Sequence, residues 1–257
     1  MKLFAYLCLV GVIGVGSVHA QLIGSTTMVD RKLLTALAEI KPIPPAEQTP
    51  VLMIGDSMMR LLGSAMEKEL AQKQGIVASS FSSIGTGLAR LDAFDWMQKM
   101  TELLAERKPM VVVVSLGAND RQVIVSGDGS KLLVGSKEWE SEYARRVTQF
   151  MDMLQGGGVK HVIWLTLPDM KDPGQQAYAV RVNKIFADVA ATHAQVKLFE
   201  TAPVLAAKSG RFVSYVMGSD GAIVTVRDPD GVHLSTDGAR RLAQALVLTY
   251  WKTEKAQ

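Results

Sequence analysis

Short apolar runs without polar alternation recur along this sequence, separated by segments with helical spacing. The runs are Val51–Ile54, Ile76–Phe81, Met110–Leu116, His161–Leu167 and Val196–Phe199. Such runs are typical of strands covered on both faces, which is how parallel sheets are built. Between them, apolar residues recur at helical spacing, as at Met58, Leu62, Met66 and Leu70. This alternation predicts a doubly wound α/β fold with a mainly parallel sheet.

The first twenty residues have the layout of a signal peptide. Lys2 supplies a positive start, Leu3–Gly16 is apolar, and Ser17-Val18-His19-Ala20 ends in small residues. The apolar run is shorter than the roughly 20 residues that a membrane-spanning helix needs, and no comparable run occurs later. We therefore expect cleavage after Ala20 and a secreted or periplasmic protein without stable membrane insertion. The alternative is an uncleaved N-terminus that anchors the chain.

Residues 21–49 are predicted to be an approach segment ahead of the folded domain. A short helical stretch around Arg31–Ile40 precedes a proline-rich stretch that runs from Lys41 to Pro50. Closely spaced prolines fix φ and remove backbone donors, which is typical of a linker. The remainder, residues 50–257, is long enough for one sizeable domain.

Composition and motifs argue against a metal, nucleic acid or a dinucleotide as a ligand. The only cysteine, Cys8, lies in the predicted signal peptide, so we expect no disulfide and no cysteine ligand for a metal. The net charge of +3 is small and no dense Lys/Arg run is present, which argues against nucleic acid. The loop around Gly85 and Gly87 has Arg90 where a dinucleotide fingerprint needs its third glycine. We expect neither a cofactor nor a metal.

Polar residues follow the apolar runs, at the strand ends where ligands of open α/β sheets bind. They are Gly55-Asp56-Ser57, Ser82–Gly87 and Gly117-Ala118-Asn119-Asp120, and a fourth group, Asp228–His233, precedes a predicted last helix at Thr236–Leu248. Each group alone has a structural explanation, such as a helix cap or a hydrogen-bonded turn. Their joint occurrence at successive strand ends favours a catalytic site.

These groups supply the parts that acyl transfer requires. A serine hydroxyl is a weak nucleophile unless a base takes its proton, and a third group must orient that base. Asp230 and His233 are three residues apart on one turn, so Asp230 can orient the His233 ring towards Ser57. The N–H of Ser57, a glycine N–H of the second group and the Asn119 amide would form the oxyanion hole.

Elimination favours His233 as the base. His19 leaves with the predicted signal peptide, His161 opens a strand on the side opposite the expected site, and His193 lies near a helix end. Only His233 has a carboxylate at a useful sequence offset. Asp228 is a less favourable orienter than Asp230, because a proline turns the chain between them.

The four groups resemble the four sequence blocks of the SGNH (GDSL-type) hydrolases. The match covers Gly55-Asp56-Ser57, a glycine of the second loop, Gly117–Asp120 and Asp230-Gly231-Val232-His233. The resemblance implies a three-layer, flavodoxin-like fold and ester hydrolysis through an acyl-serine. It carries over Ser57, Asp230 and His233 as the triad and Asn119 as an oxyanion donor.

The second block departs from the common Asn-containing form and offers both Gly85 and Gly87. Gly87 is preferred, because the Gly87–Trp96 segment is similar to a bacterial envelope branch with a Gly-Leu…Phe-Asp-Trp signature. The Trp164–Met170 segment and the insertion Arg121–Glu138 are also similar to that branch. Some relatives of this kind remove or transfer acetyl groups on envelope polysaccharides or peptidoglycan.

The resemblance leaves three functions to compare. We expect a serine esterase that removes O-acetyl or other short acyl groups from an envelope carbohydrate. One alternative is a carbohydrate O-acyltransferase, in which a sugar hydroxyl replaces water at the acyl-serine. The other is a glycan-binding module that keeps the fold without catalysis.

Overall fold

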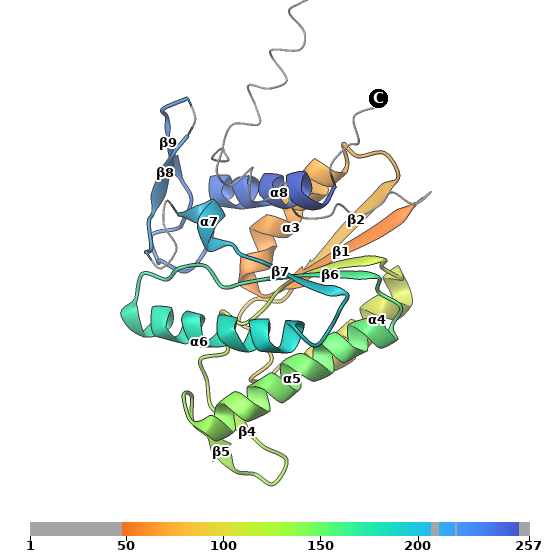
Figure 1. The fold of residues 1–257 in the computed structure, drawn as a ribbon, viewed down its shortest axis with the longest axis vertical. Coiled ribbons are helices and arrows are strands. Elements are labelled where there is room, and N and C mark those ends of the chain that lie inside the picture. Colours follow the sequence, from red (N-terminus) through yellow and green to blue (C-terminus); the bar gives the residue numbers. More distant parts are fainter. Residues whose placement is uncertain (1–47, 207–210, 219, 252–257) are drawn as a thin grey trace, which may run out of the picture.

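A computed structural model describes residues 48–206, 211–218 and 220–251 of the chain, and Figure 1 shows their arrangement. The predicted signal peptide and nearly all of the predicted approach segment lie outside the described residues. Helices cover both faces of a central sheet, which gives three layers. The predicted α/β fold with a parallel sheet is confirmed.

Five parallel strands form the central sheet, in the order β2-β1-β3-β6-β7. They are β1 (Thr49–Gly55), β2 (Ile76–Ser82), β3 (Val111–Ser115), β6 (His161–Leu165) and β7 (Val196–Phe199). All five predicted strands are therefore present, with ends that differ by a residue or two. The chain runs outward from β1 to β2, then crosses back to β3, so the strand order reverses beside β1. This reversal is the point at which doubly wound sheets bind ligands.

Side chains of each inner strand alternate between two apolar cores. In β1, Leu52 and Ile54 belong to one core, whereas Val51 and Met53 belong to the other. The same alternation holds in β3 and β6. Both faces of the sheet are thus buried, which is why the strands read as unbroken apolar runs.

The helices divide between the two faces of the sheet. Those on one face are α4 (Trp96–Arg107), α5 (Lys137–Gly156) and α6 (Pro173–Ala190). Those on the other are α3 (Ser57–Leu70), the short α7 (Ala202–Leu205) and α8 (Thr236–Tyr250). Among the described helices, none has an apolar stretch that could cross a membrane.

Two small antiparallel hairpins project from the layers (Figure 1). The first joins β4 (Ile124–Val125) to β5 (Lys131–Leu132) and lies within the predicted insertion Arg121–Glu138. The second joins β8 (Tyr215–Met217) to β9 (Ile223–Thr225) and directly precedes the Asp228–His233 segment. Both hairpins therefore adjoin segments that the sequence associates with the site.

Candidate active site

The loops that follow β1, β2 and β3 meet at one edge of the sheet. Gly55, the last residue of β1, pairs with Ser82 at the end of β2 and with Ser115 at the end of β3. A Cβ on Gly55 would lie 2.1 Å from the Ser115 carbonyl oxygen, so only glycine fits there. This close approach brings three of the four sequence blocks together.

Asp56 caps α3, and Ser57 is the first residue of that helix. One carboxylate oxygen of Asp56 accepts from the Met58 N–H at 2.9 Å, and the other accepts from the Ala118 N–H at 3.2 Å. The buried Asp56 side chain thus ties the start of α3 to the loop after β3. Ser57 is left partly exposed at the helix N-terminus, where the positive end of the dipole favours negative charge.

Ser57, His233 and Asp230 form a continuous hydrogen-bonded relay. The Nε2 atom of His233 lies 2.8 Å from Ser57 Oγ, and Nδ1 lies 2.6 Å from Asp230 Oδ2. Because a carboxylate only accepts hydrogen bonds, Nδ1 carries the proton and Nε2 accepts from the serine hydroxyl. The structure thus brings together the three residues named from sequence, although 176 positions separate Ser57 from His233.

Local hydrogen bonds keep Asp230 charged. Burial alone would raise the pKa of Asp230, but hydrogen bonds from the His233 ring and from the backbone N–H groups of Val232 and His233 outweigh it. The net effect lowers the pKa of Asp230 to about 2. The carboxylate can therefore orient the ring throughout the neutral pH range.

Arg227 holds the Asp230–His233 turn against the loop after β6. Its guanidinium is buried and donates to the carbonyl oxygens of Val232 at 2.7 Å and Asp169 at 2.6 Å. Gly231 has a φ of +78°, which favours glycine in this turn. Sequence spacing did not identify Arg227, because its partners are backbone groups that carry no sequence signal.

The loop after β2 lies beside Asn119. Asn119 Nδ2 donates to the Thr86 carbonyl oxygen at 3.1 Å, and its second hydrogen remains for another acceptor. Gly85 is exposed, and its absent Cβ would point into open space. Gly87 is buried, and a Cβ there would lie 2.1 Å from Asp120 Oδ1. Of the two glycines, Gly87 is the one that packs against the Asn119-Asp120 loop.

Asp120 is a buried residue for which the sequence pattern predicts no role. It accepts hydrogen bonds from the N–H groups of Leu88 and Ala89 and from the Tyr143 hydroxyl. Burial raises the pKa of Asp120. For Asp56, burial is again the largest cause and raises the pKa to about 7. Two buried carboxylates thus underlie the loops around Ser57.

The other two described histidines lie away from Ser57. His161 is the first residue of β6 and so lies at the opposite edge of the sheet. His193 is buried, with Nε2 3.1 Å from Asp152 Oδ1 and Nδ1 2.9 Å from the Val189 carbonyl oxygen. His193 thus also has a carboxylate partner, although not at a short sequence offset. Asp152 is distant in sequence, and the pair joins α5 to the end of α6.

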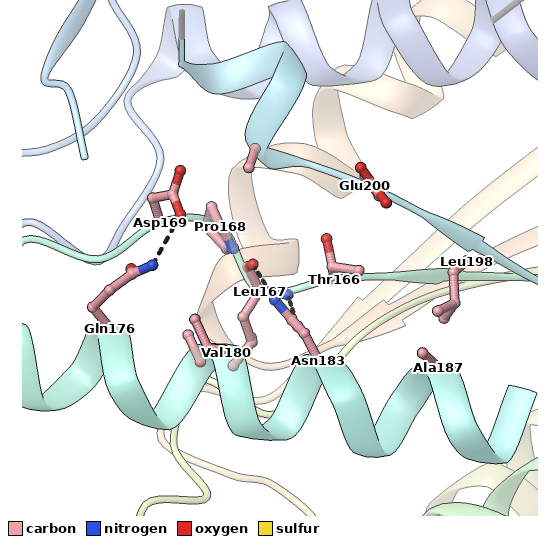
Figure 2. Close-up of a pocket in the computed structure, with 12 residues that line it drawn as sticks. Thr166, Leu167, Pro168, Asp169, Gln176, Val180, Asn183, Ala187, Leu198 and Glu200 are labelled. Atoms are coloured by element: carbon pink, nitrogen blue, oxygen red, sulfur yellow. Dashed lines mark hydrogen bonds between the residues drawn. The ribbon is translucent and has the colours of Figure 1, made fainter. Parts of the chain in front are cut away.

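A cavity of about 280 Å³ lies between α6 and the ends of strands β6 and β7 with the segments that follow them. Figure 2 shows Val180 and Asn183 projecting from α6 towards the segment that contains Thr166 and Pro168. Asn183 Oδ1 accepts from the Leu167 N–H, and Asn183 Nδ2 donates to the Leu167 carbonyl oxygen. These two bonds hold the cavity wall formed by the segment after β6. The wall continues to Asp169, whose carbonyl accepts from Arg227. The Arg227 side chain therefore connects the cavity wall to the Asp230–His233 turn.

Within the described ranges, no cluster of three or more His, Cys, Asp or Glu side chains could hold a metal ion. The polar groups at the site are instead a hydroxyl, an imidazole, carboxylates and amides. This set is suited to proton transfer and to binding an anionic oxygen.

Residues 50–249 match the model of a family described as "Protein of unknown function (DUF459)". No curated protein matches the sequence.

Several solved structures share the fold at low sequence identity. A protein of Slackia heliotrinireducens, described as a candidate SGNH hydrolase, is 17% identical, with a TM-score of 0.54 over 79% of this chain and 98% of its own. A family 3 carbohydrate esterase of Talaromyces cellulolyticus is 14% identical, with a TM-score of 0.51 over 77% and 94%.

A third similar structure is the periplasmic domain of a lipopolysaccharide acetyltransferase of Salmonella ser. Paratyphi A. It is 12% identical, with a TM-score of 0.50, and the match covers 93% of this chain and 98% of that one. The three likenesses establish that the chain has the SGNH-hydrolase fold.

Proposed function

This chain belongs to the family described as "Protein of unknown function (DUF459)". For this member of the family, we propose the function of a serine esterase of acylated carbohydrates. The observation that carries the proposal is the relay from Asp230 through His233 to Ser57, with contacts of 2.6 and 2.8 Å. Both contacts are within hydrogen-bond reach, as a nucleophile, its base and the orienting acid require.

In the first half of the reaction, Ser57 Oγ attacks the carbonyl carbon of the ester while its proton passes to His233 Nε2. The carbonyl π electrons move to oxygen, and the resulting oxyanion is bound by the N–H groups of Ser57 and Gly87 and by Asn119 Nδ2. The intermediate then collapses: the C–O bond to the sugar breaks, and His233 gives its proton to the departing oxygen. An acyl-serine and a free sugar hydroxyl remain.

In the second half, water replaces the sugar. His233 Nε2 accepts a proton from water as its oxygen attacks the acyl carbon, and the same donors bind the new oxyanion. Collapse breaks the bond to Ser57 Oγ, which regains its proton from His233, and the carboxylic acid leaves. Throughout, Asp230 stabilises the imidazolium that forms after each proton transfer.

The substrate class is supported by the similar structures and by the cavity. Two of them carry names that refer to carbohydrate esters or to lipopolysaccharide acetyl transfer. The cavity, at about 280 Å³, is slightly smaller than the roughly 300–1,000 Å³ typical of ligand pockets, which suits a single sugar ring. We place the sugar ring there and a short acyl group, such as acetyl, at Ser57.

The proposal is tested by hydrolysis of 4-nitrophenyl acetate by the wild type and by Ser57→Ala. Loss of a serine nucleophile in a triad lowers kcat by about 10⁶-fold in a well-studied protease, so we expect kcat of Ser57→Ala to fall by several orders of magnitude. Circular dichroism would establish that the variant is folded. A folded Ser57→Ala protein with the wild-type rate would exclude Ser57 as the nucleophile.

A second candidate function is acyl transfer, which the likeness to the lipopolysaccharide acetyltransferase domain favours. The acyl-serine is common to both, and only the acceptor differs. The ester assay should therefore be repeated with an added oligosaccharide. Acetylated oligosaccharide formed faster than free acetate would favour a transferase. A wild type that binds the glycan but neither hydrolyses nor transfers would be a binding module.

Export is part of the same proposal. The predicted signal peptide at residues 1–20 and a carbohydrate substrate outside the cytoplasm are consistent with each other. Mass determination of the mature N-terminus after expression of the full chain would test cleavage after Ala20.

A further inference from the structure

An acidic and a basic side chain hold the loop after β2. Asp120 accepts from the N–H groups of Leu88 at 3.0 Å and Ala89 at 2.8 Å. Arg146 Nη1 donates to the carbonyl oxygens of the same two residues, each at 2.9 Å. All four backbone polar groups of this dipeptide are therefore bonded. The two bonds from the Arg146 guanidinium are charge-assisted and therefore stronger than bonds between neutral groups, which helps to fix this segment.

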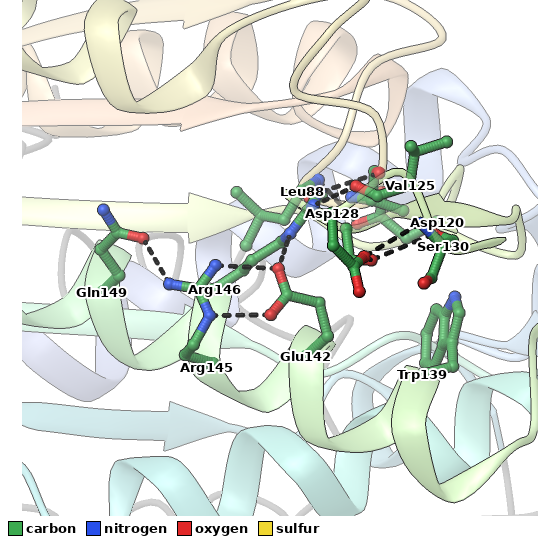
Figure 3. Close-up of polar contacts among 12 residues, drawn as sticks. Leu88, Asp120, Val125, Asp128, Ser130, Trp139, Glu142, Arg145, Arg146 and Gln149 are labelled. Carbon is green, nitrogen blue, oxygen red and sulfur yellow. Dashed lines mark hydrogen bonds and ion pairs between the residues drawn. The ribbon is translucent and has the colours of Figure 1, made fainter. Parts of the chain in front are cut away.

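Arg146 reaches the loop from the middle of α5. The residue is 8% exposed, and its Nε donates to Glu142 Oε1 at 2.8 Å. Its Nη2 donates to the Val125 carbonyl oxygen in β4 at 3.3 Å. Figure 3 shows Arg146 turned towards Leu88 and Val125, whereas Arg145 is turned towards Glu142 and Gln149. One guanidinium thus joins α5, the β4–β5 hairpin and the loop after β2.

The ion pair between Arg146 and Glu142 stays charged near neutral pH. A hydrogen bond from Arg145 is the largest influence on Glu142; burial opposes it, and a hydrogen bond from Arg146 adds to it. Together these lower the pKa of Glu142 to about 2. Arginine itself remains protonated in proteins.

The clamped dipeptide adjoins both oxyanion donors of the proposed mechanism. Gly87 directly precedes Leu88, and Asn119 directly precedes Asp120 in sequence. Asn119 also donates to the Thr86 carbonyl on the other side of Gly87. A shift of the dipeptide would therefore change the spacing between the Gly87 N–H and the Asn119 amide.

We propose that Arg146 is a positioning residue that fixes Gly87 relative to Asn119 through its bonds to Leu88 and Ala89. It contacts neither Ser57 nor His233 in the structure, so it acts through the loop. The inference rests on the proposed esterase function. It also assigns a purpose to the β4–β5 hairpin, which braces the same guanidinium through Val125.

Arginine is the residue type that suits this task. Its planar guanidinium presents several fixed donors, so it can bond two successive carbonyls, a third carbonyl and a carboxylate at once. A lysine would bring the same charge on one compact ammonium group and could satisfy only part of this set.

The test compares three variants in the full chain: Arg146→Met, Arg146→Lys and Arg145→Met. Arg145 is the matched control, because it bonds the same Glu142 but makes no contact with the loop. A misplacement of about 1 Å in a catalytic group can cost about 100-fold in rate. We expect Arg146→Met to lower kcat for 4-nitrophenyl acetate by about 10- to 100-fold, or about 1.4–2.7 kcal/mol.

A thionoester identifies the oxyanion hole as the affected part. Sulfur is a weaker hydrogen-bond acceptor than oxygen, so the thiono analogue of the same acetate gains less from the hole. In the wild type the oxo ester should react faster, and Arg146→Met should reduce this preference at least severalfold. KM should change less than kcat, Arg146→Lys should recover part of both effects, and Arg145→Met should resemble the wild type.

Rates would be normalised to folded sites, measured by the initial burst of 4-nitrophenol at a temperature below each thermal transition. If Arg146→Met and Arg145→Met then have the same kcat and the same preference for the oxo ester, the positioning role is wrong. If kcat falls without a change in that preference, Arg146 acts on something other than the oxyanion hole, and the proposal is again wrong. An inactive wild type would instead contradict the esterase function itself.

Asp120 offers a second variant in case Arg146→Met does not fold. Asp120→Asn keeps the size of the side chain but places an amino group opposite one of the two N–H donors. We expect the same reduced preference for the oxo ester, because the loop is released from the other side. An unchanged preference in folded Asp120→Asn would contradict the clamp.

Discussion

Neighbouring residues at the end of β1 have separate tasks. Asp56 caps α3 and bonds Ala118, whereas Ser57 Oγ faces His233. A helix cap and a nucleophile are alternative explanations for a lone Gly-Asp-Ser. In the structure Asp56 forms the cap, and the adjacent Ser57 hydroxyl bonds His233 as the proposed nucleophile would. The cap fixes the backbone from which the serine hydroxyl projects.

Replacement of Asp230 should affect the proposed base through its tautomer. In Asp230→Asn the side chain can donate to Nδ1, which would leave the proton on Nε2 and remove the acceptor for Ser57. The equivalent change in a serine protease lowers kcat by about 10⁴-fold, and we expect a loss of that order. Steady-state hydrolysis of 4-nitrophenyl acetate measures it. A decrease of less than tenfold in the folded variant would show that Asp230 does not orient the base.

Asp56 should make the fold less stable as pH rises. Burial is the main reason that its pKa is raised from 3.8 to about 7. The folded state therefore keeps this proton between about pH 4 and pH 7, whereas the unfolded state has lost it. In that window Asp56 contributes a slope of about −1.4 kcal/mol per pH unit to the free energy of unfolding. The contribution is most favourable below about pH 4 and is lost as pH approaches 7.

Urea unfolding of the wild type and Asp56→Asn from pH 4 to pH 8 would measure this slope. In Asp56→Asn the pH-dependent contribution of this carboxyl group should be absent, even if the variant's free energy of unfolding differs from that of the wild type at every pH. Parallel curves for the two proteins across that window would contradict a carboxyl group that titrates near neutrality.

At the scale of elements, the loop after β2 depends on the absence of a side chain at Gly87. A Cβ there would lie 2.1 Å from Asp120 Oδ1, inside the clamp that fixes Leu88 and Ala89. The neighbouring Gly85 has open space and a φ of +76°, so its glycine serves the turn. The two glycines therefore meet different requirements.

Gly87→Ala should displace the loop and lower kcat. Loss of a single oxyanion donor costs about 100- to 1,000-fold, and we expect a decrease of up to that size. Gly127→Ala is the control, because that position has open space and no positive φ. Equal kcat values for the two alanine variants would exclude Gly87 from the oxyanion hole.

At the scale of the whole molecule, the relay and the cavity occupy neighbouring parts of one sheet edge. The relay joins the ends of β1 and the loop before α8, whereas the cavity lies between α6 and the β6–β7 side of the sheet. Arg227 connects the two through Asp169 and Val232. In the proposed function, the sugar ring occupies this cavity and the acyl group lies at Ser57.

Val180→Trp tests whether the cavity binds the sugar. Val180 lines the cavity and is 60% exposed, so a larger side chain would fill the space without entering the core. We expect KM for an acetylated oligosaccharide to rise about tenfold, which corresponds to about 1.4 kcal/mol, and KM for 4-nitrophenyl acetate to change less. Val77→Trp, on the opposite edge strand, is the control. Similar KM values for both variants would place the sugar elsewhere.

The sequence by itself was sufficient for the α/β fold, because strands buried on both faces read as unbroken apolar runs. It also sufficed to select Ser57, Asn119, Asp230 and His233 as candidates, since strand ends of a parallel sheet share one edge. The tertiary structure alone revealed Arg146, Arg227 and the Asp152–His193 pair. The arginines bond backbone carbonyls, and the histidine's carboxylate is remote in the chain. Neither kind of contact produces a local pattern, because only folding brings the partners together.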